Sequence, residues 1–246
     1  MDLNTAIATS RLTAQQRGIE VTANNLANAN TPGFKAQRVQ FADWLSRQSG
    51  ADVPRGGVMV SFTQDRATWR DQQPGPLSHT GNTFDLALTG DGFFTIGAAR
   101  GTRLTRDGRF GTLPDGTLAD SSANPVLDAA GQPIRIPPTA RQISIAGDGT
   151  ISTDDGPIGK IGVVRPNDPS RLKAEGGTLL EAPGGTTPVE QPSLVQGSLE
   201  ESNVQPVLEL TRMISDSREF QFLSQFVQAE GDRQQSAIDK LLPANT

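Results

Sequence analysis

The stretch Asn24-Asn25-Leu26-Ala27-Asn28-Ala29-Asn30-Thr31-Pro32-Gly33-Phe34 decides how the fold begins. It follows a segment with helical periodicity, and asparagine tolerates the left-handed backbone conformation that often ends a helix. Pro32 stops a helix and disfavours the α conformation at Thr31, whereas Gly33 allows a turn. No reactive group is present, so the stretch shapes the backbone. We interpret it as a helix end followed by a signature turn, whose residues are Asn25, Asn28, Asn30, Thr31, Gly33 and Phe34.

Upstream of this turn, apolar residues recur at helical spacing. Leu12, Ile19 and Leu26 repeat every seven residues, and a weaker row runs through Leu3, Ile7, Ala14 and Val21. This spacing predicts one helix of about 26 residues, about 39 Å long at 1.5 Å per residue. Many positions of the rows are small or polar, so we expect the helix to need partner helices.

A second amphipathic segment lies at the other end of the chain. Met213, Phe220 and Val227 repeat every seven residues, which predicts a helix from about 204 to 242. Ser202 or Asn203 is the expected N-cap, since Pro206 then lies in the first turn, where proline is tolerated. The side chains of Phe220, Phe222 and Phe226 suggest helix-packing positions better than an aromatic ligand box.

The two ends carry opposite charge. Residues 1–48 hold five basic and three acidic side chains, net +2, while residues 198–242 hold four basic and eight acidic ones, net −4. Long amphipathic helices of opposite sign are suited to pair with each other and with further copies. We therefore predict a coiled coil of the two ends and an assembly interface made of Leu12, Ile19, Leu26, Met213, Phe220 and Val227.

The middle of the chain has a different composition. Residues 50–200 hold 23 of the 26 Gly and 14 of the 17 Pro, so this zone is rich in turns. Asp-Gly pairs at 91–92, 107–108, 115–116, 148–149 and 155–156 lie beside short alternating runs, a pattern typical of β-hairpins. The pattern predicts an antiparallel β domain between Gly- and Pro-rich connectors. Val39, Phe41, Trp44 and Leu45 indicate either a partner-docking patch or local packing of the first connector.

These observations predict an α+β protein with a β-rich antiparallel centre and long terminal helices that pair as a coiled coil. Five segments follow from the composition zones. They are an N-terminal axial helix and turn (1–34), an extended connector (35–79), a central β domain (80–165), a return connector (166–197) and a C-terminal axial helix (198–246).

Composition excludes several functional classes. The formal charge of −5 and a pI of about 5.0 leave no basic excess for nucleic acid. Cysteine is absent, which removes thiolate nucleophiles, disulfides and cysteine-based zinc sites. No run of eighteen apolar residues is present, and residues 1–5 lack the basic and apolar regions of a signal peptide. We expect no membrane insertion, and export, if it occurs, by a route without a cleaved signal.

Three candidate chemical sites are weak. Ser78, His79 and Asp85 could be drawn as a hydrolase triad, but the Gly-x-Ser-x-Gly pattern around a nucleophile is missing. The stretch 147–156 has carboxylates but lacks the ligand spacing of a calcium loop. Gly90-Asp91-Gly92 lacks the lysine, third glycine and following helix of a phosphate loop. The sequence predicts no enzyme, no cofactor and no metal.

Several blocks of the chain resemble the bacterial flagellar basal-body rod protein family. The resemblance begins with Asn25-Leu26-Ala27-Asn28 and the Asn30-Thr31-x-Gly33-Phe34 that follows it. It continues, in the same order as in the family, through residues 81–94, 105–110, 125–127, 143–151, 161–164 and 196–204, with Met213-Ile214. It covers nearly the whole chain. Length and block content are most similar to the proximal rod members, followed by the distal rod members.

The resemblance implies a structural subunit that polymerises helically into the hollow rod of the basal body, a drive shaft that transmits motor torque and passes export substrates. Its implied partners are copies of itself, other rod proteins and the flagellar type III export apparatus, which exports the family uncleaved. The alternatives are a distal rod or hook-type axial protein, an exported module that binds a ligand through its β domain, and a hydrolase centred on His79.

Overall fold

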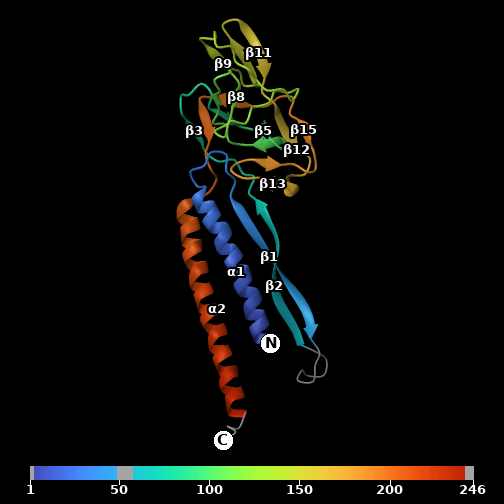
Figure 1. The fold of residues 1–246 in the computed structure, drawn as a ribbon, viewed down its shortest axis with the longest axis vertical. Helices are drawn as coiled ribbons and strands as arrows, with labels where there is room; N and C mark the ends of the chain where they lie inside the picture. The colour runs from blue at the N-terminus through green and yellow to red at the C-terminus, as the bar shows by residue number, and fades with distance from the viewer. Residues whose placement is uncertain (1–2, 49–57, 242–246) are drawn as a thin grey trace. The chain divides into compact units, whose positions relative to one another are not determined.

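The chain folds into two compact units, seen in a computed structural model that describes residues 3–48 and 58–241 (Figure 1). The first unit comprises Met1–Ala27, Gln37–Asp71 and Gln205–Thr246, so it draws on both ends of the chain. The second comprises Asn28–Ala36 and Gln72–Val204.

The first unit contains two helices and a hairpin. Helix α1 spans Leu3–Ala27 and helix α2 spans Pro206–Leu241. Strands β1 (Gln37–Gln48) and β2 (Val58–Arg70) pair antiparallel over their whole length, with a register shift between Gln40 and Phe41. Helix α1 lies between α2 and this hairpin and contacts all three elements (Figure 1).

The expectation that α1 and α2 pair as a coiled coil is wrong, although the α+β class is compatible with the structure. A coiled coil buries large a and d side chains in the holes of its partner helix. Here the buried side chains in the described part of α1 are small or polar, and Glu209 is the one fully buried side chain within the described part of α2. Helix α1 also packs on the hairpin, so α2 is not its only partner, and the structure does not show the two helices as a coiled coil. The α1 side chains concerned are Ala8, Ala14, Val21, Thr22 and Asn25.

The expected start of the second helix is also displaced. Helix α2 begins at Pro206, and neither Ser202 nor Asn203 caps it. Asn203 instead bonds outside the helix, accepting from the backbone N of Ala36 (2.8 Å) and donating to the carbonyl of Gln73 (2.9 Å). Pro206 keeps the tolerated first position, because its missing N–H has no helical partner to lose there. Among the described helices, none combines the length and the apolar character needed to cross a bilayer.

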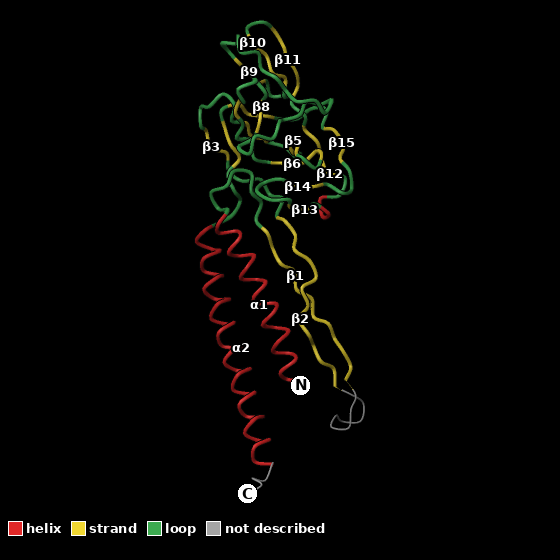
Figure 2. The backbone as a smooth tube through the Cα atoms, in the orientation of Figure 1, coloured by secondary structure: helices red, strands yellow, loops and turns green. Residues whose placement is uncertain are grey.

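The second unit is β-rich, with short strands joined by long loops (Figure 2). Its largest sheet has the order β13-β14-β6-β5-β12-β15, and a three-stranded sheet has the order β11-β10-β9. The strand pairs among the described residues are antiparallel. The strands are β3 (Leu77–His79), β4 (Leu86–Leu88), β5 (Phe93–Ala98), β6 (Gly101–Thr105), β7 (Gly111–Thr112), β8 (Leu118–Ala119), β9 (Ile143–Ile145), β10 (Thr150–Thr153), β11 (Gly156–Lys160), β12 (Val163–Pro166), β13 (Lys173–Ala174), β14 (Leu180–Glu181), β15 (Thr186–Pro188), β16 (Leu194–Gln196) and β17 (Ser198–Glu200), with a 3-10 turn at Pro169–Arg171.

The returning chain pairs with the strands that open this unit. Strand β16 pairs with β4 and β17 pairs with β3, in a register that sets Ser198 opposite His79. Residues 35–79 and 166–197, expected as connectors, contain β1–β3 and β13–β16. The five segment boundaries expected from composition stay a prediction.

A core of large apolar side chains holds the second unit together. Its centre is Phe94, which is 0% exposed and meets the ring of Phe110 edge-on at 5.2 Å between centroids. Burying each such side chain contributes about 1.5–3 kcal/mol. The members of this core are Leu86, Leu88, Phe94, Ile96, Phe110, Leu118, Val126, Ile134, Ile136, Ile145, Ile151, Ile161, Val163 and Leu194.

Three of the five Asp-Gly pairs join antiparallel neighbours, as the sequence predicts. They connect β7 to β8, β9 to β10 and β10 to β11. In two of them the aspartate accepts two hydrogen bonds from the threonine after the glycine, and these bonds hold the pKa values of Asp115 and Asp148 below the usual value. The pairs at 91–92 and 107–108 instead link strands of different sheets.

Candidate assembly site

Residues 28–34 of the signature turn belong to the second unit. Local bonds close it, because the backbone N of Thr31 donates to the carbonyl of Asn28 (3.1 Å) and that of Phe34 donates to the carbonyl of Thr31 (3.2 Å). The hydroxyl of Thr31 also donates to the side chain of Asn28 (3.3 Å), while Asn30 is exposed. The residues after the first helix thus form a turn closed by local hydrogen bonds, and their role as a signature stays a prediction.

Gly33 is required at its position for two reasons. Its φ of +69° lies in the left-handed region, which side chains other than glycine rarely adopt. A Cβ placed there would collide with the backbone of Arg106 and Asp107. The close approach lets the backbone N of Gly33 donate to the carbonyl of Glu200 at 2.7 Å. The turn therefore packs between β17 and the segment that follows β6.

A buried group of three charged side chains surrounds this contact, which we call the Glu200 cluster: Lys35, Arg106 and Glu200. The side chain of Glu200 is 1% exposed and pairs with both cations, at 3.0 Å from Arg106 Nη1 to Glu200 Oε2. The backbone N of Gly75 also donates to the Glu200 carboxylate at 3.1 Å. Removing one partner of a buried pair costs about 3–5 kcal/mol, because it leaves the other charge unpaired.

The Glu200 cluster has two cations and one carboxylate, and backbone carbonyl oxygens accept the remaining hydrogen bonds of the cations. Lys35 donates to the carbonyl of Gln73 at 2.7 Å, and Arg106 donates to those of Leu88 (3.3 Å) and Gly90 (2.7 Å). The guanidinium of Arg106 lies 5.4 Å from the ring centre of Phe93, a cation–π distance. In the described part of the chain, Arg106 Nε is buried without a hydrogen-bond partner. The site binds chain segments together and holds no nucleophile.

A second buried carboxylate organises the first unit, in what we call the Glu209 cluster: Asn25, Arg38, Glu209 and Arg212. Glu209 is 0% exposed and accepts from Arg38 (2.5 Å), Arg212 (3.1 Å) and the Asn25 amide (3.2 Å). Asn25 also exchanges two bonds of 2.8 Å with the backbone of Gln37. Since Glu209 is in the first turn of α2, the helix dipole favours its charge as well. The cluster ties α1, β1 and α2 together.

The predicted interface residues are not buried in the chain itself. Leu12, Ile19 and Leu26 on α1 are half-buried, as are Met213, Phe220 and Val227 on α2. Each row keeps apolar surface to offer a further helix, and its role as an assembly interface stays a prediction. The side chains of Phe41, Trp44 and Leu45, expected as part of a docking or packing patch, lie outside those that the structure describes.

Six charged residues of the two clusters escape sequence reasoning: Lys35, Arg38, Arg106, Glu200, Glu209 and Arg212. Charged side chains are mostly exposed, so a lone Glu in a polar stretch gives no sign of burial. The one local pattern that bears on burial is the alternation of inward and outward side chains along β17. It predicts that Leu199 points inward and Glu200 outward. Both are buried, because the signature turn covers the face that Glu200 presents.

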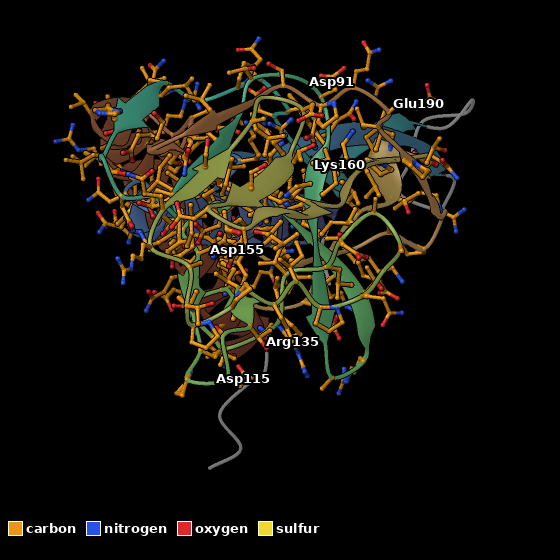
Figure 3. The ribbon with its side chains drawn as sticks, turned by 90° about the horizontal axis from the view of Figure 1, so that it is seen from above. Asp91, Asp115, Arg135, Asp155, Lys160 and Glu190 are labelled. Atoms are coloured by element: carbon orange, nitrogen blue, oxygen red, sulfur yellow. The ribbon has the colours of Figure 1, made fainter. Side chains whose placement is uncertain are left out.

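The other sites considered from sequence do not assemble. Among the described residues, His79 makes no side-chain hydrogen bond to Ser78, and the carboxylate of Asp85 accepts from Asn82 (3.1 Å). The acidic turn residues Asp91, Asp115 and Asp155 lie apart (Figure 3). In the described ranges no three His, Cys, Asp or Glu side chains are placed to hold a metal ion.

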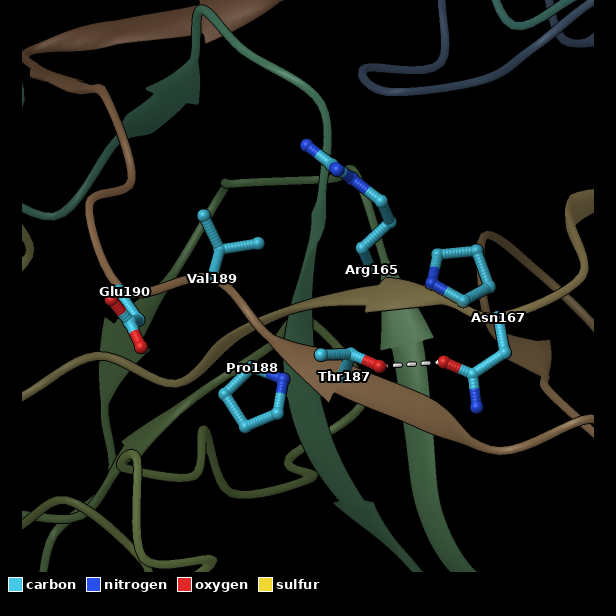
Figure 4. Close-up of a pocket in the computed structure, with 7 residues that line it drawn as sticks. Arg165, Asn167, Thr187, Pro188, Val189 and Glu190 are labelled. Carbon is cyan, nitrogen blue, oxygen red and sulfur yellow. Dashed lines mark hydrogen bonds between the residues drawn. The ribbon is translucent and has the colours of Figure 1, made fainter.

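A groove of about 420 Å³ runs beside strands β12 and β15 (Figure 4). Its ionisable groups are Arg165 and Glu190, and the hydroxyl of Thr187 donates to the side chain of Asn167 at 2.7 Å. The lining offers no base beside a nucleophile, so its chemistry is that of an ordinary polar surface.

Comparison with known proteins decides the family. Residues 6–35 match the model described as flagella basal body rod protein, residues 87–153 the flagellar hook protein FlgE/F/G D1 domain, and residues 195–240 the flagellar basal body rod FlgEFG protein C-terminal model. The flagellar basal-body rod protein FlgF of Caulobacter vibrioides is 36% identical over 243 residues, which covers 98% of each chain. The chain belongs to the flagellar basal-body rod protein family.

Other rod proteins are similar over nearly the same length. FlgF of Mesorhizobium japonicum is 36% identical over 239 residues, 96% of each chain. FlgG of Bacillus subtilis is 33% identical over 249 residues, which covers 91% of this chain and 93% of the relative. As a flagellar basal-body rod protein, the chain is a structural subunit of the rod and resides in the flagellar basal body. The names of these relatives describe rod proteins and no catalytic activity.

The two clusters connect the regions that define this rod protein. Lys35 lies in the first matched region, Arg106 in the second and Glu200 in the third, so the Glu200 cluster joins all three. Asn25 and Glu209 likewise join the first and third. Regions far apart in the rod protein sequence thus meet at buried carboxylates.

Proposed function

We propose that this rod protein polymerises helically with copies of itself and with other rod proteins, forming a hollow shaft that transmits motor torque and passes export substrates. The observation that carries the proposal is the half-burial of the two heptad rows, Leu12-Ile19-Leu26 and Met213-Phe220-Val227. Apolar rows left half-covered in one chain gain stability when neighbouring chains cover them. In this proposal segments 1–34 and 198–246 form the axial part of each subunit.

A tube follows from repetition of one such contact. A heterologous interface whose rotation does not close on itself generates a helical assembly. The subunit resists torsion because its ends are held by buried charges, with Glu209 binding α1, β1 and α2 in one unit. Breaking such a contact leaves a buried charge unpaired, so deforming the unit under torque costs free energy.

The proposed route to the rod is the flagellar type III export apparatus. A chain without cysteine crosses into the periplasm with no risk of wrong disulfide pairing. We assign the subunit to the proximal rod, on the similarity to proteins named FlgF at 36% identity. The alternative is a distal rod position, which the 33% identity to a FlgG favours.

A matched pair of substitutions tests the assembly role. Leu26→Asp places a charge in the α1 row, and Ala27→Asp adds the same charge at the exposed next position. In cells that lack the native copy, we expect Leu26→Asp to abolish rod completion and swimming, and Ala27→Asp to preserve both, because a carboxylate is costly to bury without a partner. The measurement is electron microscopy of isolated basal bodies together with motility in soft agar.

Melting curves of the purified variants separate loss of folding from loss of assembly. Rods of normal length with Leu26→Asp in place would refute the assignment of this row to the interface. Basal bodies that lack the wild-type chain altogether would refute the role in the rod.

A further inference from the structure

One asparagine of the second unit lies beside a place where the chain leaves that unit. The chain passes between the two units at several peptide bonds, which we call the crossings: Ala27-Asn28, Ala36-Gln37, Asp71-Gln72 and Val204-Gln205. Asn203 stands just before the last crossing, in the segment between β17 and α2. Its side chain is half-buried, and its hydrogen bonds reach segments next to two other crossings.

Asn203 ties these segments together within the second unit. Its Oδ1 accepts from the backbone N of Ala36 at 2.8 Å, and its Nδ2 donates to the carbonyl of Gln73 at 2.9 Å. Its own backbone N donates to the carbonyl of Phe34 at 3.4 Å. We call Ala36, Gln73 and Asn203 the exit clamp, because each of them is at most two residues from a crossing.

Backbone contacts beside the exit clamp hold two of its segments in register. The backbone N of Glu201 donates to the carbonyl of Pro76 at 2.9 Å. A Cβ at Gly75 would lie 1.9 Å from the carbonyl oxygen of Glu201, so only glycine allows this approach. Pro74 and Pro76 fix φ on either side of Gly75, which leaves the segment few soft dihedrals. The incoming chain therefore enters the second unit as a stiff piece.

An asparagine suits position 203 for a chemical reason. Its amide carries an acceptor oxygen and two N–H donors on one short, neutral side chain. The backbone N of Ala36 requires an acceptor, and the carbonyl of Gln73 requires a donor, so the two partners also fix which way the amide faces. A carboxylate could satisfy only the first partner, and an ammonium group only the second.

Tied segments respond to torsion differently from free ones. Each residue of a free segment has two soft dihedrals, so a single crossing can twist without breaking a hydrogen bond. Once the segments share hydrogen bonds, twisting one of them breaks a bond or turns the others with it. The exit clamp therefore makes the ends of the second unit move as one group.

We propose that Asn203 is a positioning residue that joins the crossings of the second unit into one group, so that torsion enters this unit without unwinding its ends. The inference rests on the proposed role in transmitting torque and assigns part of that role to one side chain. It predicts a defect that depends on mechanical load and leaves assembly intact.

A matched pair of substitutions tests the clamp. Asn203→Ala removes both side-chain bonds. Asn167→Ala removes two bonds of the same kind elsewhere in the second unit, one accepted from Thr187 (2.7 Å) and one donated to the carbonyl of Gly184 (3.1 Å). In the purified full-length chain, exchange of the Ala36 amide hydrogen should become about tenfold faster in Asn203→Ala, the effect of losing one hydrogen bond, and stay unchanged in Asn167→Ala.

Motility under load provides the second measurement. Each variant replaces the native copy in cells, and swimming speed is recorded in buffer and in a medium thickened with an inert polymer, which raises the torque on the rod. Both variants are expected to assemble rods and to swim like the wild type in buffer. In the thickened medium, cells with Asn203→Ala are expected to lose swimming, whereas cells with Asn167→Ala keep the wild-type speed.

These outcomes separate the two proposals. Equal swimming of the two variants in the thickened medium, or an unchanged Ala36 amide in Asn203→Ala, would overturn the role of the clamp and leave the rod function standing. Absence of the wild-type chain from isolated rods would overturn the proposed function itself.

A second variant covers the case in which Asn203→Ala assembles few rods. Asn203→Asp keeps the oxygen that accepts from Ala36 and removes the donor to Gln73. It is expected to assemble normally and to swim more slowly than Asn167→Ala in the thickened medium. Wild-type swimming of Asn203→Asp in that medium would overturn the proposal.

Discussion

The two units of this chain bury different kinds of side chain. In the second unit the core consists of large apolar residues such as Phe94, Leu86 and Ile96, each 0% exposed. In the first unit the buried apolar side chains on α1 are Ala8, Ala14 and Val21, while Phe222 on α2 is 69% exposed. Among the described side chains, the second unit buries large apolar residues, whereas the helices of the first unit bury small ones and leave Phe222 exposed.

The buried carboxylates show the same contrast. Around Glu200, the side chains of Lys35 and Arg106 are 4% and 9% exposed. Around Glu209, those of Arg38 and Arg212 are 28% and 46% exposed. The charged network of the second unit is closed to water, whereas that of the first unit is still partly hydrated. The buried carboxylate of the first unit therefore has partners that are more accessible to solvent than those of the second unit.

The sharpest test of this contrast exchanges one phenylalanine in each unit. Phe94→Ala should lower the free energy of unfolding of the second unit by about 3–5 kcal/mol, since it empties a fully buried site. Phe222→Ala should change the stability of the free chain by no more than about 0.5 kcal/mol, because that ring is exposed. Amide hydrogen exchange in each unit, followed as a function of urea, measures both. A large loss in the Phe222 variant would mean that the first unit is as complete as the second.

Tryptophan fluorescence assigns the transitions to the two units. The two tryptophans of the chain, Trp44 and Trp69, lie in β1 and β2 of the first unit. Phe94→Ala is expected to shift the loss of amide hydrogen-exchange protection in the second unit and to leave the fluorescence transition in place. Coincident shifts of both signals would show that the units unfold together.

The next effect in size concerns the closed charge network. Glu200→Gln should destabilise the second unit by about 3 kcal/mol, because Lys35 and Arg106 remain charged and lose their counter-ion. The amide oxygen still accepts one bond, which keeps the loss at the lower end of the range for a broken buried pair. Glu201→Gln, at the half-buried neighbouring position, serves as the control. Equal melting temperatures for the two variants would contradict the structural role of the Glu200 cluster.

The smallest effect is a difference in pH dependence between the units. Burial and the nearby charge of Glu219 raise the pKa of Asp216 in the first unit, so its ionised form disfavours folding. That cost is absent below the unfolded value of about 3.9 and appears as pH rises through the raised folded pKa. Asp216→Asn should therefore raise the melting temperature at pH 7 by about 1–2 °C and have no effect near pH 3.

Asp115 of the second unit should behave in the opposite way. Hydrogen bonds from Thr117 lower the pKa of Asp115, so its contribution to stability is present above the unfolded value and lost as pH falls through the folded one. Asp115→Asn is expected to lower the melting temperature at pH 7 and to have no effect in strong acid. Melting curves of both variants from pH 2 to pH 8 measure the two slopes, and slopes of equal sign would refute this difference.

Sequence reasoning succeeds where the signal is local. Asp115-Gly116 and Asp148-Gly149 form the predicted turns because their geometry depends on two or three adjacent residues. The signature turn is predictable for the same reason, from Pro32 and Gly33. The N-cap prediction fails because Asn203 has a distant partner, Ala36, that a local pattern does not reveal.

The assembly site is only partly predictable for a related reason. The heptad of Met213, Phe220 and Val227 marks a real face of α2, yet the larger exposed side chains Phe222 and Phe226 lie on another. A periodic row shows that a face is apolar, but it does not reveal which neighbour covers that face. The coiled-coil prediction fails because the hairpin of β1 and β2 also packs on α1. Nothing in the sequence of α1 reveals that contact.

The amino-acid sequence by itself determined two long terminal helices, a turn-rich β centre, the absence of cysteine chemistry and the membership of a rod family. These properties follow from composition, periodicity and short motifs, which act over a few residues. Tertiary structure alone decided that Lys35, Arg106 and Glu200 meet in one buried cluster and that one side of α2 stays exposed. The physical reason is that burial depends on which distant segments arrive at a surface, and the free energy of a charge or an apolar ring is set by that environment.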